Sequence, residues 1–332
     1  MTADNPNETQ VQENWLSMIL RLVKNKYIRF VFLLLLLGFA VVQISMHYHD
    51  LATRVLNFDI NWTLIILAFL LTCLATIVGI FCWGLIMSGM GFEIKWIKIS
   101  QIQVYSSLAK YIPGFIWQVA GKTYMSHEAG IPSSMAVIGF GLEVTLTLFV
   151  GMAIFFFTAP FTSGRGWFQI YDNFLWKATG LIFFFLLMGI PILCKYFFKK
   201  LFQKHDVRVR VLRWYLTLVL ILFGWFLLSA ACQLSILALG VSDLNFVDSV
   251  LAVSGSYVAG LVFFFAPSGI VIRETILVML LPDVIDRSLG ILLSVILRME
   301  TINADFLLGL VILIISAISR GLSGDNSKLS RT

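Results

Sequence analysis

"KYIPGFIWQVAGK", residues 110–122, places a Pro-Gly pair between two lysines inside a chain that is apolar over long stretches. Proline lacks a backbone N–H donor, and glycine loses more conformational freedom than other residues when it becomes helical, so the pair disfavours a continuous helix. The stretch therefore predicts a helix that is interrupted at Pro113 and Gly114, with a cation on either side of the break.

The composition gives this break its setting. Of the 332 residues, 59% are hydrophobic and only 13% are charged, and the mean hydropathy is +0.91. Soluble domains have about a quarter of their residues charged, so these values predict an integral membrane protein. The formal charge of +6 does not indicate a nucleic-acid partner, because lysine and arginine collect at the ends of apolar segments and form no separate basic domain.

The apolar segments define the expected fold. A spanning helix needs about 20 apolar residues, and we expect an all-α polytopic membrane protein with about six full spans and two broken hairpins. A single transmembrane domain is expected over 28–320, between a cytoplasmic tail with an interfacial helix at 1–27 and a cytoplasmic tail at 321–332. The expected segments are 28–46, 62–89, 99–125 (interrupted), 133–160, 174–198, 214–240, 249–281 (interrupted) and 287–320 (interrupted).

Positive charges orient these segments, because cytoplasmic loops carry an excess of lysine and arginine. Such residues precede the first span and form a cluster at 195–214, whereas the loops at 47–61 and 161–173 are poor in them. The cations before the first span and the cluster at 195–214 are both cytoplasmic only if segment 99–125 enters the membrane from the cytoplasm and returns to it. Segment 249–281 must then enter from the outside and return. The charges therefore predict two re-entrant hairpins of opposite orientation and two cytoplasmic termini.

The two broken segments also resemble each other. "SLAKYIPGFIWQ", residues 107–118, and "LVFFFAPSGIVIRE", residues 261–274, both lead apolar residues into a proline that is followed by glycine, directly or after one serine. A cation lies shortly beyond each break, Lys122 in the first and Arg273 in the second. Breaks at corresponding positions in two halves indicate a central site between inverted repeats.

These residues resemble a known family. "SSLAKYIPGFIWQVAGKTYMSHEAGIPSSMAV", residues 106–137, is similar to the signature of the lysylphosphatidylglycerol synthase transmembrane region family. "FAPSGIVIRETILVMLL", residues 265–281, resembles its second signature, and "ILRMET", residues 296–301, resembles its late arginine. The resemblance implies a polytopic helical domain with flippase-like activity toward lipids, and we expect it in the inner, cytoplasmic membrane of a prokaryote.

Two departures from the family refine the expectation. Some members are fused to a cytosolic aminoacyl-lipid synthase, but this chain ends at Thr332 without a soluble domain, so we expect transport and no enzymatic activity. Members often have an acidic-basic pair where this chain has "GLEVTLTLF", residues 141–149, in which Glu143 has no adjacent arginine. We expect Glu143 either to pair with a cation of the first broken segment or to bond to backbone.

Charged side chains within apolar segments are the candidate substrate-binding residues, since polar groups at membrane depth mark functional sites. Lysine holds a phosphate as a point charge, and arginine holds it with two parallel hydrogen bonds. Each candidate also has a structural explanation. Lys110 and Lys122 could snorkel to the interface, Arg273 and Glu274 could form a purely structural ion pair, and 298–305 could be an exposed turn. The candidates are Lys110, Pro113, Gly114, Trp117, Gln118, Lys122, Glu143, Pro267, Gly269, Arg273, Glu274 and Arg298.

The sequence lacks the HExxH, GxSxG and Walker motifs and paired metal-ligand spacings, so no cofactor or metal is expected. We expect a lipid translocase that moves an anionic or phosphate-bearing lipid, either a phospholipid or a polyprenyl-phosphate-linked glycan. Alternatives are a membrane-embedded lipid- or glycan-modifying transferase and a non-transporting scaffold of an envelope assembly complex. Expected partners are the lipid, a second copy of the chain or envelope-biosynthesis enzymes, and no nucleic acid.

Overall fold

The computed structural model describes residues 60–111, 116–162, 173–201, 209–262, 272–282, 285 and 287–329. The chain divides into two units, residues 1–57 and 58–332, and every described residue belongs to the second. The expected interfacial helix and first span lie outside the described residues. The same holds for the four residues of the two breaks, Pro113, Gly114, Pro267 and Gly269.

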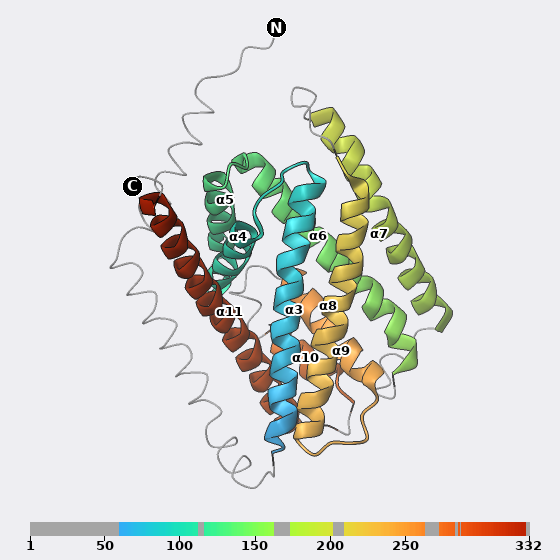
Figure 1. The fold of residues 1–332 in the computed structure, drawn as a ribbon. Helices are drawn as coiled ribbons and strands as arrows, with labels where there is room; N and C mark the ends of the chain where they lie inside the picture. The colour runs from blue at the N-terminus through green and yellow to red at the C-terminus, as the bar shows by residue number, and fades with distance from the viewer. Residues whose placement is uncertain are drawn as a thin grey trace. The chain divides into compact units, whose positions relative to one another are not determined.

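The described residues form an all-helical fold without β-strands (Figure 1). Nine α-helices and two short 3-10 helices follow one another along this part of the chain. They are α3 (Trp62–Gly89), α4 (Trp96–Leu108), η1 (Ala109–Tyr111), α5 (Ile116–Glu128), α6 (Ser133–Thr158), η2 (Ala159–Phe161), α7 (Asn173–Leu201), α8 (Val211–Ala238), α9 (Phe246–Val262), α10 (Ile272–Leu280) and α11 (Arg287–Leu329).

Five helices in the described part of the chain are long and apolar enough to cross a membrane, so the protein is an integral membrane protein. These segments correspond to five of the six predicted full spans. They are Trp62–Gly89, Ser133–Phe161, Leu175–Tyr196, Val211–Ala238 and Ser288–Ile318.

The interruption expected within the last span is wrong. Helix α11 runs without a break from Arg287 to Leu329, and its residues Glu300 and Asp305 are buried. The exposed turn considered for 298–305 is therefore also wrong. The charges do not break the helix because side chains of other helices contact them, as described below.

Two pairs of shorter helices lie among the long ones. We call α4, η1 and α5 the first helix pair, and α9 and α10 the second; the helices of each pair pack against each other. Helices α4 and α5 have 13 residues each. At about 1.5 Å per residue each is about 20 Å long, less than the roughly 30 Å of bilayer hydrocarbon. Helices end before and begin after both predicted breaks, between 111 and 116 and between 262 and 272.

Antiparallel packing of α3 and α8 fixes the two ends of the bundle. The Asn61 amide donates to the Ala238 carbonyl over 3.0 Å at one end, and the Arg210 amide donates to the Gly89 carbonyl over 2.8 Å at the other. Gly89 lies against the buried indole of Trp214, which a Cβ atom would overlap. A glycine is therefore required for this approach of the two helices.

The helix pairs begin at opposite ends of this α3–α8 framework (Figure 1). The Trp96 ring at the start of α4 lies 5.2 Å from that of Phe81, near the Gly89 end. Gln233, near the Ala238 end of α8, donates from Nε2 to the Leu244 carbonyl just before α9 over 3.0 Å. Helix α11 packs against α3, α4, α8 and α10, and so contacts both helix pairs.

Candidate functional site

Charged and tyrosine side chains from both helix pairs meet on α11. We call this set the central cluster. It contains three cations and two carboxylates, a net charge of +1 when all five are ionised. Its members are Lys110 and Tyr111 of η1, Tyr257 of α9, Arg273 and Glu274 of α10, and Arg298 and Asp305 of α11.

The edge of the first break is attached to α11 through Asp305. Lys110 Nζ lies 2.6 Å from Asp305 Oδ2, and the Tyr111 hydroxyl donates to the same oxygen over 2.5 Å. The Tyr111 ring also stacks on Phe306, with 6.3 Å between centroids. The Asp305 side chain is only 3% exposed and that of Lys110 is 30% exposed, so the lysine remains accessible while its partner is enclosed.

The second break is followed by two charged residues with different partners. The Arg273 guanidinium lies over the Tyr257 ring, 3.2 Å from its centroid, as a cation–π contact. Glu274 Oε1 lies 3.7 Å from Arg298 Nη1. Glu274 Oε2 is buried and has no hydrogen-bond partner among the described residues.

The space within the central cluster is small. Arg273, Glu274 and Arg298 line a cavity of about 10 Å³ together with residues of α9, α10 and α11. A cavity of this size holds about one water molecule. The central cluster is thus closed in this conformation, and a phosphate group does not fit within it.

One face of α11 extends from the central cluster toward the Gly89 end of the bundle. Arg298, Asp305, Gly309 and Ser316 share this face, because their spacings of 7, 4 and 7 residues are close to whole turns. A Cβ atom on Gly309 would lie 3.3 Å from Leu108 Cδ1 of α4. Helices α4 and α11 therefore approach closely just beyond the central cluster.

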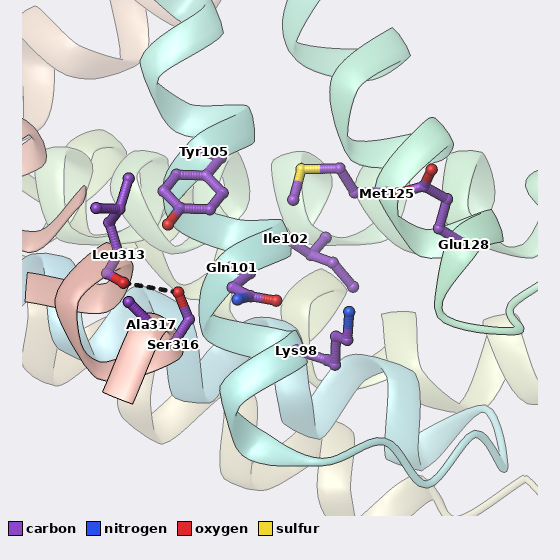
Figure 2. Close-up of a pocket in the computed structure, with 9 residues that line it drawn as sticks. All are labelled: Lys98, Gln101, Ile102, Tyr105, Met125, Glu128, Leu313, Ser316 and Ala317. Atoms are coloured by element: carbon purple, nitrogen blue, oxygen red, sulfur yellow. Dashed lines mark hydrogen bonds between the residues drawn. The ribbon is translucent and has the colours of Figure 1, made fainter. Parts of the chain in front are cut away.

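A larger cavity opens farther along the same face (Figure 2). Its volume of about 430 Å³ falls within the usual range for small-molecule sites. Figure 2 shows Lys98 of α4 and Glu128 of α5 on its walls, with Leu313 and Ser316 of α11 on the other side. We call it the α4–α11 pocket; it is lined by Lys98, Gln101, Ile102, Tyr105, Met125, Glu128, Leu313, Ser316 and Ala317.

Lys122 has a different environment from Lys110. Its side chain is 1% exposed, forms an ion pair with Glu143 and lies 3.9 Å from the centroid of the Trp83 ring. Gln103 Nε2 donates to the other Glu143 oxygen over 3.0 Å. The predicted pairing of Glu143 with a cation of the first broken segment is confirmed, and snorkelling of Lys122 is wrong.

Two other candidates lie near the first break. Trp117 and Gln118 are half-buried in the first turn of α5, next to the segment that the structure does not describe. Arg273 and Glu274 of α10 and Arg298 of α11 lie in the central cluster.

Sequence reasoning missed three members of the central cluster. Tyr111 stands within the quoted "KYIPG" motif. Asp305 lies seven residues after Arg298, so Arg298 and Asp305 share one face of the continuous helix α11. Tyr257 carries no such signal, because a tyrosine in an apolar helix is usually a packing residue.

The described residues contain no group of three His, Cys, Asp or Glu side chains that could hold a metal ion. No family model, curated protein or solved structure matches the chain. Membership of the lysylphosphatidylglycerol synthase transmembrane region family therefore stays a prediction from the quoted motifs.

Proposed function

We propose that the protein is a membrane lipid translocase of the flippase type, which moves a phosphate-bearing lipid across the bilayer. The carried lipid is a phospholipid or a polyprenyl-phosphate-linked glycan. The supporting observation is the central cluster, in which cations from both helix pairs meet on a spanning helix. Charge within the spanning segments is costly, and a cluster of charges there marks a substrate or ion path by default.

In this proposal the two helix pairs are re-entrant hairpins of an inverted repeat. Helix α4 starts near the Gly89 end of the α3–α8 framework and α9 starts near the Ala238 end, which supports entry from opposite membrane faces. The Gly89 end also lies beside Arg210 and Arg213, which both contact Glu93. By the excess of positive charge, this end is the cytoplasmic one.

The headgroup follows the shared face of α11 while its tails remain in the lipid. The α4–α11 pocket offers Lys98 to an anionic headgroup, and apolar walls such as Ile102 and Leu313 to the first part of the tails. Twelve residues separate Lys98 from Lys110, a path of about 18 Å along α4 at about 1.5 Å per residue. The close contact at Gly309 separates the pocket from the central cluster in the closed conformation.

Opening the central cluster exposes the groups that bind phosphate. Asp305 and Glu274 hold Lys110 and Arg298 in the closed conformation and keep these cations oriented. A lipid phosphate replaces the carboxylates as the partner, with Arg298 supplying two parallel hydrogen bonds and Lys110 a point charge. The small cavity requires this rearrangement before the headgroup passes.

A reconstituted transport assay tests the proposal. Purified protein is placed in vesicles that contain headgroup-labelled lipids, and a membrane-impermeant quencher measures how fast inner-leaflet label reaches the outside. We expect faster exchange of at least one phosphate-bearing lipid than in protein-free vesicles. Arg298→Ala lowers the gain by about tenfold or more, whereas the matched control Arg210→Ala, which removes an exposed arginine, retains it.

The same assay separates the alternatives. Vesicles with protein that exchange every tested lipid no faster than empty vesicles overturn the proposal. Formation of a new lipid product from a labelled donor would instead indicate a transferase. A scaffold would keep its cellular role after Arg298→Ala, since it does not depend on this charge.

A further inference from the structure

Glu300 is a buried carboxyl group that the proposed lipid path does not use. It lies two residues after Arg298 on α11, so it faces away from the central cluster, toward α3 and α8. It is only 4% exposed and lies within the spanning segment Ser288–Ile318. Ser235 of α8 contacts Oε1 over 2.9 Å, and Thr72 of α3 contacts Oε2 over 3.4 Å.

Two hydroxyl hydrogens face Glu300, and each has a second acceptor that competes for it. Ser235 Oγ also lies 3.0 Å from the Ala231 carbonyl, and Thr72 Oγ1 lies 3.1 Å from the Ala68 carbonyl. Each hydroxyl has one hydrogen, which bonds either to its backbone carbonyl or to Glu300. A protonated Glu300 adds a donor of its own, so both hydroxyls can keep their backbone carbonyls while the carboxyl group still bonds to one hydroxyl oxygen. In an enclosed site without a paired cation, this neutral acid fits better than a carboxylate held by two shared hydroxyl hydrogens.

Charges around Glu300 do not compensate an ionised form. No ion pair among the described residues includes it, and the nearest titratable group on α8 is the buried Cys232. The facing side of α3 presents Cys73 next to Thr72, and α10 presents Arg273 and Glu274 to the central cluster. Arg298 and Asp305 lie on the other face of α11 and interact there. A bare carboxylate in this apolar site costs several kcal/mol.

We propose that Glu300 is a proton-binding site, and that binding and release of this proton control the position of α11 against α3 and α8. With the proton bound, the carboxyl group donates to one hydroxyl oxygen and α11 stays docked. When the proton leaves to water, the remaining carboxylate is held only by two shared hydroxyl hydrogens and α11 moves away from Ser235 and Thr72.

This inference identifies an energy source for the proposed translocation, and its coupling step rests on that function. Helix α11 carries Glu300 on one face and Arg298, Asp305 and Gly309 on the other. A movement of the helix at Glu300 therefore displaces the central cluster and the close contact with α4 at the same time. Proton flow down a gradient then drives lipid movement in one direction.

Infrared spectroscopy of the purified protein tests proton binding without any transport. We expect a carbonyl stretching band of a protonated carboxyl group at neutral pH that disappears in Glu300→Gln. The amide keeps the shape and a donor, so this variant retains folded yield. The control Glu93→Gln, an exposed partner of Arg210, leaves the band unchanged. Absence of a Glu300-dependent band overturns the proposal.

Transport under an imposed pH gradient tests the coupling. One pH unit corresponds to about 1.4 kcal/mol per proton, so a one-proton translocator biases the distribution of lipid between leaflets by about tenfold. We expect this bias in the wild-type protein and in Glu93→Gln, and none in Glu300→Gln. A wild-type protein that exchanges lipid equally with and without the gradient, or that responds to sodium instead, overturns the coupling while the proposed function stands. Absence of lipid exchange overturns the proposed function, and the infrared band still decides proton binding.

Discussion

Lys110 and Lys122 flank the same helix break, yet the fold gives them different roles. Lys122 is 1% exposed, paired with Glu143 and covered by the Trp83 and Phe140 rings. Lys110 is 30% exposed and shares Asp305 with the Tyr111 hydroxyl. Lys122 thus belongs to a pair whose cation is enclosed and joins α5 to α6, whereas the cation of the Lys110–Asp305 pair reaches solvent and its carboxylate keeps the Tyr111 donor.

The difference shows what a buried cation does in this protein. An enclosed ion pair is strongly destabilising when one partner is removed, because the other charge is left buried. A partly exposed pair contributes little to stability, since water replaces its partner. Substitutions at Lys122 are therefore expected to affect folding, and substitutions at Lys110 and Arg298 are expected to affect transport.

The largest effect is expected for Lys122→Ala. Removing the lysine leaves Glu143 with the Gln103 donor alone, and breaking a buried pair costs about 3–5 kcal/mol. Thermal unfolding in detergent and the folded yield measure this loss. The double variant Lys122→Met with Glu143→Leu, which removes both charges, should recover most of it. Wild-type stability of Lys122→Ala would show that the pair is not enclosed in solution.

Lys110→Ala and Arg298→Ala are expected to lower the transport rate more than the stability. When Lys110 is removed, the enclosed Asp305 keeps the Tyr111 donor and the exposed Lys110 side admits water, so the free energy of unfolding should fall by about 1–3 kcal/mol, less than for Lys122→Ala. The transport rate should fall by about tenfold or more, since a phosphate loses a cation, with about 1.4 kcal/mol per factor of ten. Arg298→Lys keeps the charge but loses the planar fork and should show an intermediate rate. Equal losses of folded yield and transport would assign both residues a structural role.

Gly309 provides a steric test between the central cluster and the α4–α11 pocket. In Gly309→Ala the new Cβ meets the flexible end of Leu108, and the gain in helix propensity of about 1 kcal/mol offsets the contact. Stability and transport should change little. Gly309→Phe overfills the contact at a cost of about 1–3 kcal/mol and should block transport. Vesicle transport and unfolding in detergent measure both variants; full transport by the Phe variant would place the path elsewhere.

The smallest effect is expected at the exposed pair Glu93–Arg210, whose atoms Oε1 and Nη1 lie 2.7 Å apart. The hydrogen bond from Arg210 and the charges of Arg210 and Arg213 lower the pKa of Glu93. A lowered pKa means that the pair stabilises the fold above the ordinary glutamate pKa and loses this contribution as the pH falls through the lowered value. Glu93→Gln should slightly lower the melting temperature at neutral pH and reduce its dependence on acid. An unchanged acid dependence would show that water screens the pair completely.

Several features of the fold follow from local sequence. Long apolar runs predicted four of the described spanning helices within a few residues and the place of a fifth, α11, whose continuity they did not predict, because a helix that spans the bilayer requires about 20 apolar residues. The two proline- and glycine-containing breaks predicted two helix boundaries. One lies between η1 and α5, and the other lies between α9 and α10. A carboxylate between Leu142 and Val144 predicted either a cation of the first broken segment or a backbone group as its partner, since an unpaired charge is expensive there, and the structure shows the cation, Lys122.

Only the tertiary structure decided which charges meet. Tyr111 and Asp305 are 194 residues apart, and Glu300 meets Ser235 and Thr72 across 65 and 228 residues. The run "RMETINAD" has the composition of an exposed turn, and it remains helical because α3, α8 and η1 supply partners for its acids. Helix periodicity and breaks are properties of neighbouring residues, whereas the pairing of buried charges depends on helix packing, which no local pattern encodes.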